Sequence, residues 1–252
     1  MHDPSILPLP QAATFVPPRR RVFAASIGLL LLAAVIAGFW NSFFFRDGSG
    51  IPLKPHLVLH GTVVAAWFVL FAAQALLVST GNVATHRRLG VLAAVVAAGV
   101  VATSLFTILH IVHNWRADGI DVDAQRGLIG LIAWGDLGAL VAYVVFLVRG
   151  LRKRRQADAH RRLMLLASFS IISPALIRIA GLPAFAGIDA ILLTIGGLLL
   201  LAAILVLHDL LTLRRVHRET LWGVPFFLVV HLAPAFALPG TALDAWLLAL
   251  MW

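Results

Sequence analysis

Long apolar runs alternate with short polar loops along almost the whole chain. Seven such runs reach the roughly 20 residues that a helix needs to cross a bilayer. They cover residues 22–45, 56–80, 88–113, 126–149, 160–180, 186–211 and 221–238. The pattern predicts an all-α fold, a polytopic bundle of seven transmembrane helices within residues 22–239. Residues 1–21 are then a cytoplasmic tail, and residues 240–252 form an apolar tail that is too short to span and is expected to lie along the membrane interface.

Prolines inside two of these runs predict local distortion. Pro174 lies within 160–180, and Pro225 and Pro234 lie within 221–238. Proline lacks the backbone N–H that a helix needs and clashes with the preceding turn. We therefore expect kinks in the fifth and seventh helices.

Composition supports a membrane protein and excludes several classes of site. Hydrophobic residues make up 61% of the 252 residues and charged residues only 12%, which does not suit soluble domains. Cysteine is absent, so disulfides, thiolate metal sites and cysteine nucleophiles are excluded. The formal net charge of +9 lies in short loops, where cations orient spans and meet anionic lipid, so no nucleic-acid partner is expected.

The positive charges alternate from loop to loop and predict an orientation. Of the 20 lysines and arginines, 15 lie at residues 19–21, 87–88, 149–162 and 214–218. The alternate loops and helix ends hold the other five. By the positive-inside rule the N-terminus lies inside and the C-terminus outside.

Four histidines gather at one end of the helix hairpin formed by residues 56–80 and 88–113. His56 and His60 are four residues apart and His110 and His113 three apart, so each pair shares a helix face. In an antiparallel hairpin we expect His60 level with His110, and His56 level with His113. Neutral imidazole ligates zinc, copper and iron, and two facing imidazoles ligate haem b. Interfacial positions and hydrogen bonds between helices are the simpler alternatives.

Three ionisable residues lie deep in the other runs and point to the same outer half of the bundle: Asp136, Arg178 and His231. Such groups cost several kcal/mol in a membrane unless they are paired or face a cavity. His231 is a further candidate metal ligand, and we expect a cofactor site that includes His60, His110, His231, Asp136 and Arg178. A structural Asp136–Arg178 ion pair is the alternative. Without a metal, histidines beside an aspartate form a proton relay, because imidazole titrates near neutrality.

Short motifs carry a family resemblance. The segment 60–74 and the motif His86-Arg-Arg-Leu-Gly90 resemble uncharacterised bacterial multi-span inner-membrane families. His160-Arg-Arg-Leu-Met164 resembles a motif of a membrane family tied to cytochrome oxidase assembly, and the chain is loosely similar to cytochrome b561-type bundles. The resemblance covers about half of the chain. It implies the bacterial inner membrane and respiratory-chain partners, but it assigns no haem ligand.

Three functions stay open at this point. The first is binding of a divalent metal ion or haem b in respiratory electron transfer or oxidase assembly. The second is a proton-coupled transporter or sensor, and the third is a membrane metal hydrolase. His56 and His60 lack the intervening glutamate of the zinc protease helix, which disfavours a protease. His86, His160 and His208 form a second, inner group of histidines whose role the sequence leaves open.

Overall fold

The structure is a computed structural model that describes residues 18–46 and 53–251, with side chains from Val22 onward in the first range. Every regular element in these ranges is helical. Predictions for residues 1–17, 47–52 and 252 lie outside the described residues. The α-helices are α1 (Pro18–Gly38), α2 (Pro55–Ser79), α3 (Val83–Leu109), α4 (Ile111–Ala117), α5 (Arg126–Arg152), α6 (Ala157–Ser170), α7 (Ser173–Ile179), α8 (Ala190–Leu213), α9 (Arg218–Ala237) and α10 (Ala242–Leu250); a π-helical turn covers Trp40–Phe44 and a 3-10 turn Pro183–Phe185.

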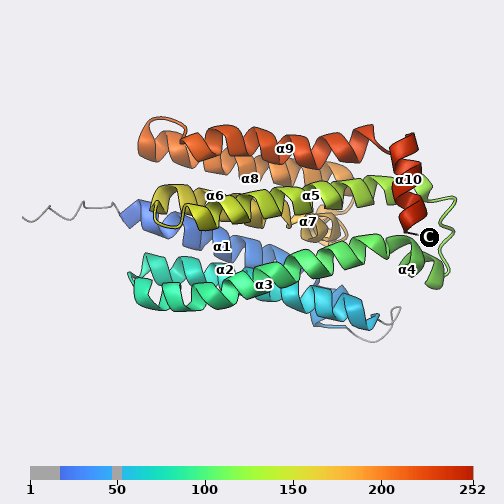
Figure 1. The fold of residues 1–252 in the computed structure, drawn as a ribbon, viewed down its shortest axis with the longest axis horizontal. Coiled ribbons are helices and arrows are strands. Elements are labelled where there is room, and N and C mark those ends of the chain that lie inside the picture. Colours follow the sequence, from blue (N-terminus) through green and yellow to red (C-terminus); the bar gives the residue numbers. More distant parts are fainter. Residues whose placement is uncertain (1–17, 47–52, 252) are drawn as a thin grey trace, which may run out of the picture.

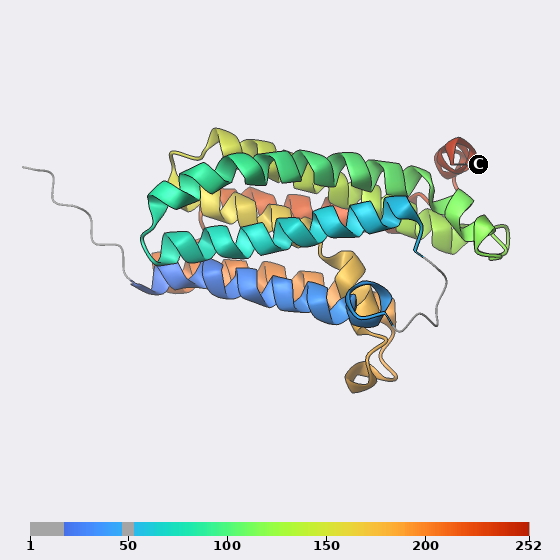
Figure 2. The same cartoon turned by 90° about the horizontal axis from the view of Figure 1, so that it is seen from below.

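The long helices lie side by side along one axis (Figures 1 and 2). The α2–α3, α5–α6 and α8–α9 connections gather at one end together with the start of α1 (Figure 1). We call this end, which carries Arg149, Lys153 and Arg162, the basic end. The opposite end, with the start of α2, the end of α3 and α4, carries His56 and His110 and is called the histidine end (Figure 1).

Five helices, α2, α3, α5, α8 and α9, are long and apolar enough to cross a membrane. The α6–α7 pair passes the same test as one bent span, which raises the number to as many as six. The apolar part of α1, Val22–Gly38, is shorter. The prediction of an all-helical membrane bundle is therefore confirmed, whereas seven spans and their orientation stay predictions.

A break between α6 and α7 confirms the predicted kink at Pro174. The two helices are bent by 51° relative to each other. In a regular helix the carbonyl of Ser170 accepts a hydrogen bond from the N–H of residue 174, and proline has none. In contrast, Pro225 and Pro234 lie inside α9, which stays one helix from Arg218 to Ala237.

The helices α5 and α9 are in close contact. A Cβ added to Gly138 would lie only 1.9 Å from the carbonyl oxygen of Val230, so the two backbones touch there. One helical turn away, a Cβ on Gly135 would meet the Cβ of Ala235 at 3.6 Å. Glycine at position 138 thus permits an approach that any side chain would prevent. The buried core around this contact includes Tyr143, Phe146, Phe169 and Phe227, each 0% exposed.

The hairpin of α2 and α3 differs from the sequence expectation in register. Asn82 accepts a hydrogen bond from the Thr85 N–H and caps α3, which begins at Val83 rather than residue 88. The earlier start leaves only a three-residue turn after Ser79. Residues of α2 therefore lie level with residues about two helical turns earlier on α3 than expected.

The apolar C-terminal tail folds as α10, which lies across the histidine end (Figure 1). Asp244 of α10 is 2% exposed and accepts hydrogen bonds from Trp134 Nε1 at 3.0 Å and from the Gly240 N–H at 2.9 Å. Leu247 and Leu248 are buried beside it. The tail is thus attached to α5 through a buried carboxylate, a contact that its apolar sequence did not predict.

Candidate functional site

The histidine end brings together three of the predicted histidines. The rings of His56 and His110 lie 6.1 Å apart between centroids, and those of His110 and His113 lie 6.5 Å apart. Asn114 donates its side-chain amide to His56 Nε2 at 3.1 Å. His110 stacks on Phe106 at 3.8 Å and donates from Nδ1 to the Phe106 carbonyl at 2.8 Å. Each ring of His56 and His110 therefore has one nitrogen engaged and one remaining.

His60 lies beside Thr103 and not beside His110. Its Nδ1 is 3.1 Å from the Thr103 hydroxyl, which itself donates to the Gly99 carbonyl at 2.8 Å. Since the hydroxyl proton is used in that second bond, Nδ1 must carry the hydrogen and donate to the hydroxyl oxygen. The other ring nitrogen, Nε2, is then the basic one. The expected His60–His110 pair is thus replaced by His60–Thr103, because of the register of α3.

Arg178 interacts with two other predicted site residues, Asp136 and His60. It lies on α7, interacts electrostatically with both Asp136 and His60, and makes no direct ion pair with Asp136 among the described residues. Its Nη1 donates to the Pro174 carbonyl at 2.8 Å, and its guanidinium lies 4.4 Å from the centroid of the Phe39 ring. Arg178 is therefore held by the short helix after the break, and its positive charge acts on His60 of α2 and Asp136 of α5.

His231 has the most constrained environment of the candidate histidines. It is 4% exposed in the centre of α9. Its Nδ1 lies 2.8 Å from the Phe227 carbonyl oxygen, and its Nε2 lies 2.9 Å from the Ser170 carbonyl oxygen. Ser170 is the residue whose carbonyl is released by Pro174. A side chain from a distant helix thus occupies the gap that the proline opens.

The two carbonyls around His231 do not suit the neutral and the charged ring equally. A neutral imidazole has one N–H and one lone pair, whereas the imidazolium has two N–H groups. Both neighbours of the ring are acceptors, so the neutral form would direct a lone pair at a carbonyl oxygen. The imidazolium satisfies both contacts, whereas burial in an apolar bundle opposes its charge. The hydrogen-bond partners of the ring and its burial therefore act in opposite directions on a proton at this position.

Acidic residues at the basic end form ion pairs that the sequence analysis did not single out. Glu219, 1% exposed, accepts from Arg149 at 2.7 and 3.2 Å and from Trp222 Nε1 at 2.7 Å, and pairs with Lys153 at 2.8 Å. Asp209, 0% exposed, pairs with Arg162 across α8 and α6. In the sequence, an acidic residue at the end of an apolar run and close to several cations could have indicated such an ion pair. Such buried pairs fix helix positions and do not by themselves form a reactive site.

The inner histidines also come together in part. The rings of His86 and His160 lie 6.4 Å apart, and His160 donates from Nδ1 to the Gly150 carbonyl at 2.9 Å. His208 packs against Phe23 with centroids 3.7 Å apart. The two related histidine motifs are thus neighbours at the basic end.

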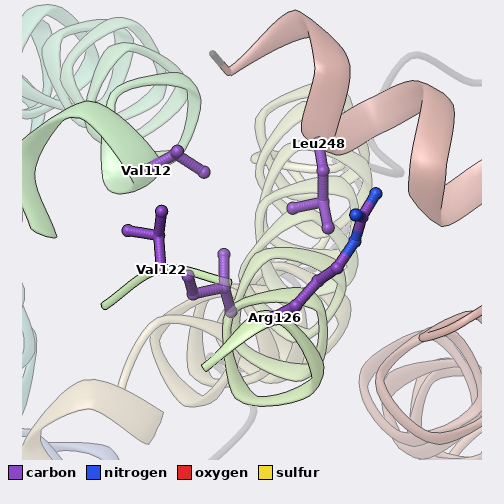
Figure 3. A pocket seen from close by; sticks show the side chains of 5 residues that line it. Val112, Val122, Arg126 and Leu248 are labelled. Atoms are coloured by element: carbon purple, nitrogen blue, oxygen red, sulfur yellow. The ribbon is translucent and has the colours of Figure 1, made fainter. Parts of the chain in front are cut away.

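No ready-made metal site is present in the part of the chain that the structure describes, since no group of three or more histidines and acids there is arranged around one point. A pocket at the histidine end is lined by Val112, Val122, Arg126, Ile129 and Leu248 (Figure 3). It is too narrow to admit a water molecule. The apolar side chains and the single arginine in Figure 3 make this pocket part of the packing under α10.

No family model, no curated protein and no solved structure matches the chain. The site therefore has to be interpreted from its own chemistry. It offers basic imidazole nitrogens at the histidine end, one positive charge at Arg178 on the short helix α7, and a buried ring between two carbonyls at His231.

Proposed function

We propose that this protein is a proton-coupled membrane transporter or sensor in which His231 binds the proton. The observation that carries the proposal is the pair of carbonyl oxygens, 2.8 and 2.9 Å from the two ring nitrogens. A buried polar group that faces an unsuitable partner costs about 1–3 kcal/mol. Loss of the proton therefore breaks one of the two contacts of the ring.

The break beside Ser170 couples this proton to movement. No backbone N–H from Pro174 holds the Ser170 carbonyl, so His231 is its partner from α9. When His231 is neutral and turns away, the end of α6 loses its contact with α9 just before the break that leads into α7. Arg178 is on α7, so its charge moves relative to Asp136 and His60 if the break opens or closes. The proton on α9 thereby controls the position of a charge on α7.

The remaining charged groups around His231 fit this coupling. On α5, Gly135 and Gly138 contact α9, and Asp136 between them in sequence interacts with Arg178. On α7 the charged residue is Arg178, and α6 contributes the neutral Ser170 carbonyl. Asp136 is the counter-charge for Arg178.

Protonation of His231 is tested with the purified protein in lipid nanodiscs, labelled with ¹⁵N-histidine. We expect a pair of protonated ring nitrogens that titrates between about pH 5 and 8 and is absent in His231→Gln. Glutamine keeps a donor for the Ser170 carbonyl but does not titrate. A single N–H on the His231 ring throughout this pH range would mean that the ring only caps a backbone carbonyl, and it would contradict the proposal.

Movement of α7 is tested separately with spin labels. The chain has no cysteine, so labels at introduced Ile179→Cys at the end of α7 and Val141→Cys on α5 are free of background. We expect their distance to change with pH in the otherwise unaltered chain and to stay constant when His231→Gln is added. A pH-dependent change that persists with His231→Gln would assign the movement to another group.

Seven spans with the N-terminus inside, in a bacterial inner membrane, complete the proposal. The gathering of the cationic connections at one end of the bundle supports it. Alkaline phosphatase fused after residue 120 or 183 should be active, and after residue 156 or 216 inactive. Activity at 156 would reverse the orientation.

A second proposal is a divalent metal ion or haem b at the histidine end, in a protein that acts with respiratory-chain partners. The spacing of His56, His110 and His113, at 6.1 and 6.5 Å, favours it. Two imidazoles on one metal ion, with bonds of about 2 Å, hold their centroids roughly 5–6.5 Å apart. His110 would ligate through Nε2, while its Nδ1 keeps the hydrogen bond to the Phe106 carbonyl. Absorbance in the Soret region and elemental analysis of the purified protein decide it, and a protein free of both haem and metal would exclude it.

A further inference from the structure

An open groove of about 960 Å³ lies between α5 and α9 at the basic end. Its lining divides into two parts. Val144, Val145 and Val148 of α5 and Leu221 and Trp222 of α9 form an apolar wall. The polar part of the lining is entirely cationic: Arg149, Arg152, Lys153 and Arg218.

The four cations are not equivalent. Arg149 and Lys153 are paired with the buried Glu219, at 2.7 and 2.8 Å. Arg152 and Arg218 are exposed and make no ion pair or hydrogen bond within the described part of the chain. One carboxylate neutralises one of the four charges, so three stay uncompensated around a single groove. Such a rim attracts an anion.

The order of these residues along the helices matches the shape of a lipid. The cations lie at the last turn of α5 and the first residue of α9, where the spans end. The valines lie one to two turns further into α5, and Val148 and Leu221 are 40% and 65% exposed. Trp222 lies between the two zones: its N–H is bound by Glu219, and Arg149 covers its ring at 4.9 Å. Tryptophan in this position marks the level of the headgroups.

We propose that this groove is a binding site for one anionic phospholipid. Arg152 and Arg218 bind the phosphate. Arg149 and Lys153 add the one positive charge that Glu219 does not neutralise. An acyl chain lies along Val144, Val148 and Leu221. Basic pockets between transmembrane helices suit such headgroups. A free phosphate would use the cations but would leave the apolar wall without a partner.

The test compares two double variants of the full chain with equal changes in charge. Arg152→Gln/Arg218→Gln removes the two unpaired groove cations, and Arg154→Gln/Arg155→Gln removes two exposed cations of the same basic segment that do not line the groove. Each protein is placed in nanodiscs of phosphatidylcholine with phosphatidylglycerol as the probe. Retained lipid is then counted by native mass spectrometry after release into mild detergent.

We expect one retained phosphatidylglycerol per chain in the unaltered protein. Since one basic side chain near an anionic lipid is worth roughly a fivefold gain, the groove variant should bind about twentyfold more weakly. The control variant should stay within about twofold. An equal loss of bound lipid in both variants would mean that overall charge attracts the lipid. Unchanged lipid binding in both variants would show that the groove is not a lipid site.

The apolar wall provides an independent readout. Leu221→Gln alters an exposed position and should weaken phosphatidylglycerol retention with all four cations present. Inorganic phosphate at millimolar concentration should not displace the lipid. Displacement by phosphate, or retention unchanged in Leu221→Gln, would show that the groove binds a soluble anion and contradict the proposal.

Discussion

The contact between Gly138 and α9 gives the sharpest prediction of stability. Alanine at 138 would place a Cβ 1.9 Å from the Val230 carbonyl oxygen, and real Cβ contacts essentially never fall below 3.0 Å. The neighbouring atom is backbone, so it has no rotamer by which to move. The helices α5 and α9 must therefore separate by about 1 Å along their main contact.

The magnitude follows from two opposing terms. Overpacking of this kind costs about 1–3 kcal/mol. Alanine in place of glycine in a helix returns about 0.5–1 kcal/mol through the unfolded chain. Gly135→Ala receives the same gain without the clash, since its Cβ would be 3.6 Å from Ala235, an ordinary contact. The gain cancels between the two variants, so we expect Gly138→Ala to be about 1–3 kcal/mol less stable than Gly135→Ala.

Equilibrium unfolding in mixed micelles with increasing SDS measures both variants against the unaltered chain. Because His231 follows Val230, Gly138→Ala should also disturb the ¹⁵N signals of the His231 ring, whereas Gly135→Ala should leave them in place. Equal stability of the two variants would refute the close α5–α9 packing, and with it the position of His231 opposite Ser170.

Three further predictions concern the two ends of the bundle. Asp209→Asn leaves Arg162 buried without its partner and should cost about 3–5 kcal/mol, whereas Arg162→Met/Asp209→Leu should cost less, as a double-mutant cycle in the same SDS assay would reveal. Burial, with the positive charge of Arg162, lowers the pKa of His217 below its ordinary 6.5, and the neutral ring accepts the Glu219 N–H at the start of α9. Because the pKa of His217 is lower in the folded than in the unfolded chain, the neutral ring stabilises the fold fully above about pH 6.5, and this stabilisation decreases as the pH falls towards the pKa of the folded chain. The variant His217→Asn keeps an acceptor but does not titrate, so its thermal stability should depend less on pH in that range. Asp244→Ala should release α10 by removing the bonds from Trp134 and the loop, at about 1–3 kcal/mol, with faster hydrogen exchange confined to α10; unchanged exchange there would contradict the docking.

The sequence predicted which residues belong to the candidate site, but it did not predict which of them contact one another. His60, Asp136 and Arg178 do come within electrostatic range, and His56, His110 and His113 do gather at one end. The pairing of His60 depended on where α3 begins, and a capping Asn82 sets that point at Val83. A start five residues earlier than expected is enough to replace His110 by Thr103. Hydropathy does not contain this information, because the turn and the helix start are both of mixed polarity.

The sequence by itself determined that this is a helical membrane bundle, where its long helices lie, and that Pro174 interrupts one of them. These properties follow from local chemistry: apolar length over about 20 residues, and a proline that has no N–H to donate. Only the tertiary structure decided that His231 of α9 fills the gap at Ser170, that Glu219 binds two cations, and that α5 and α9 touch at Gly138. Each of these contacts joins residues more than 60 positions apart, so it depends on the rotation and offset of whole helices. Those are fixed by how close two backbones can approach, and that is a property of the packed bundle.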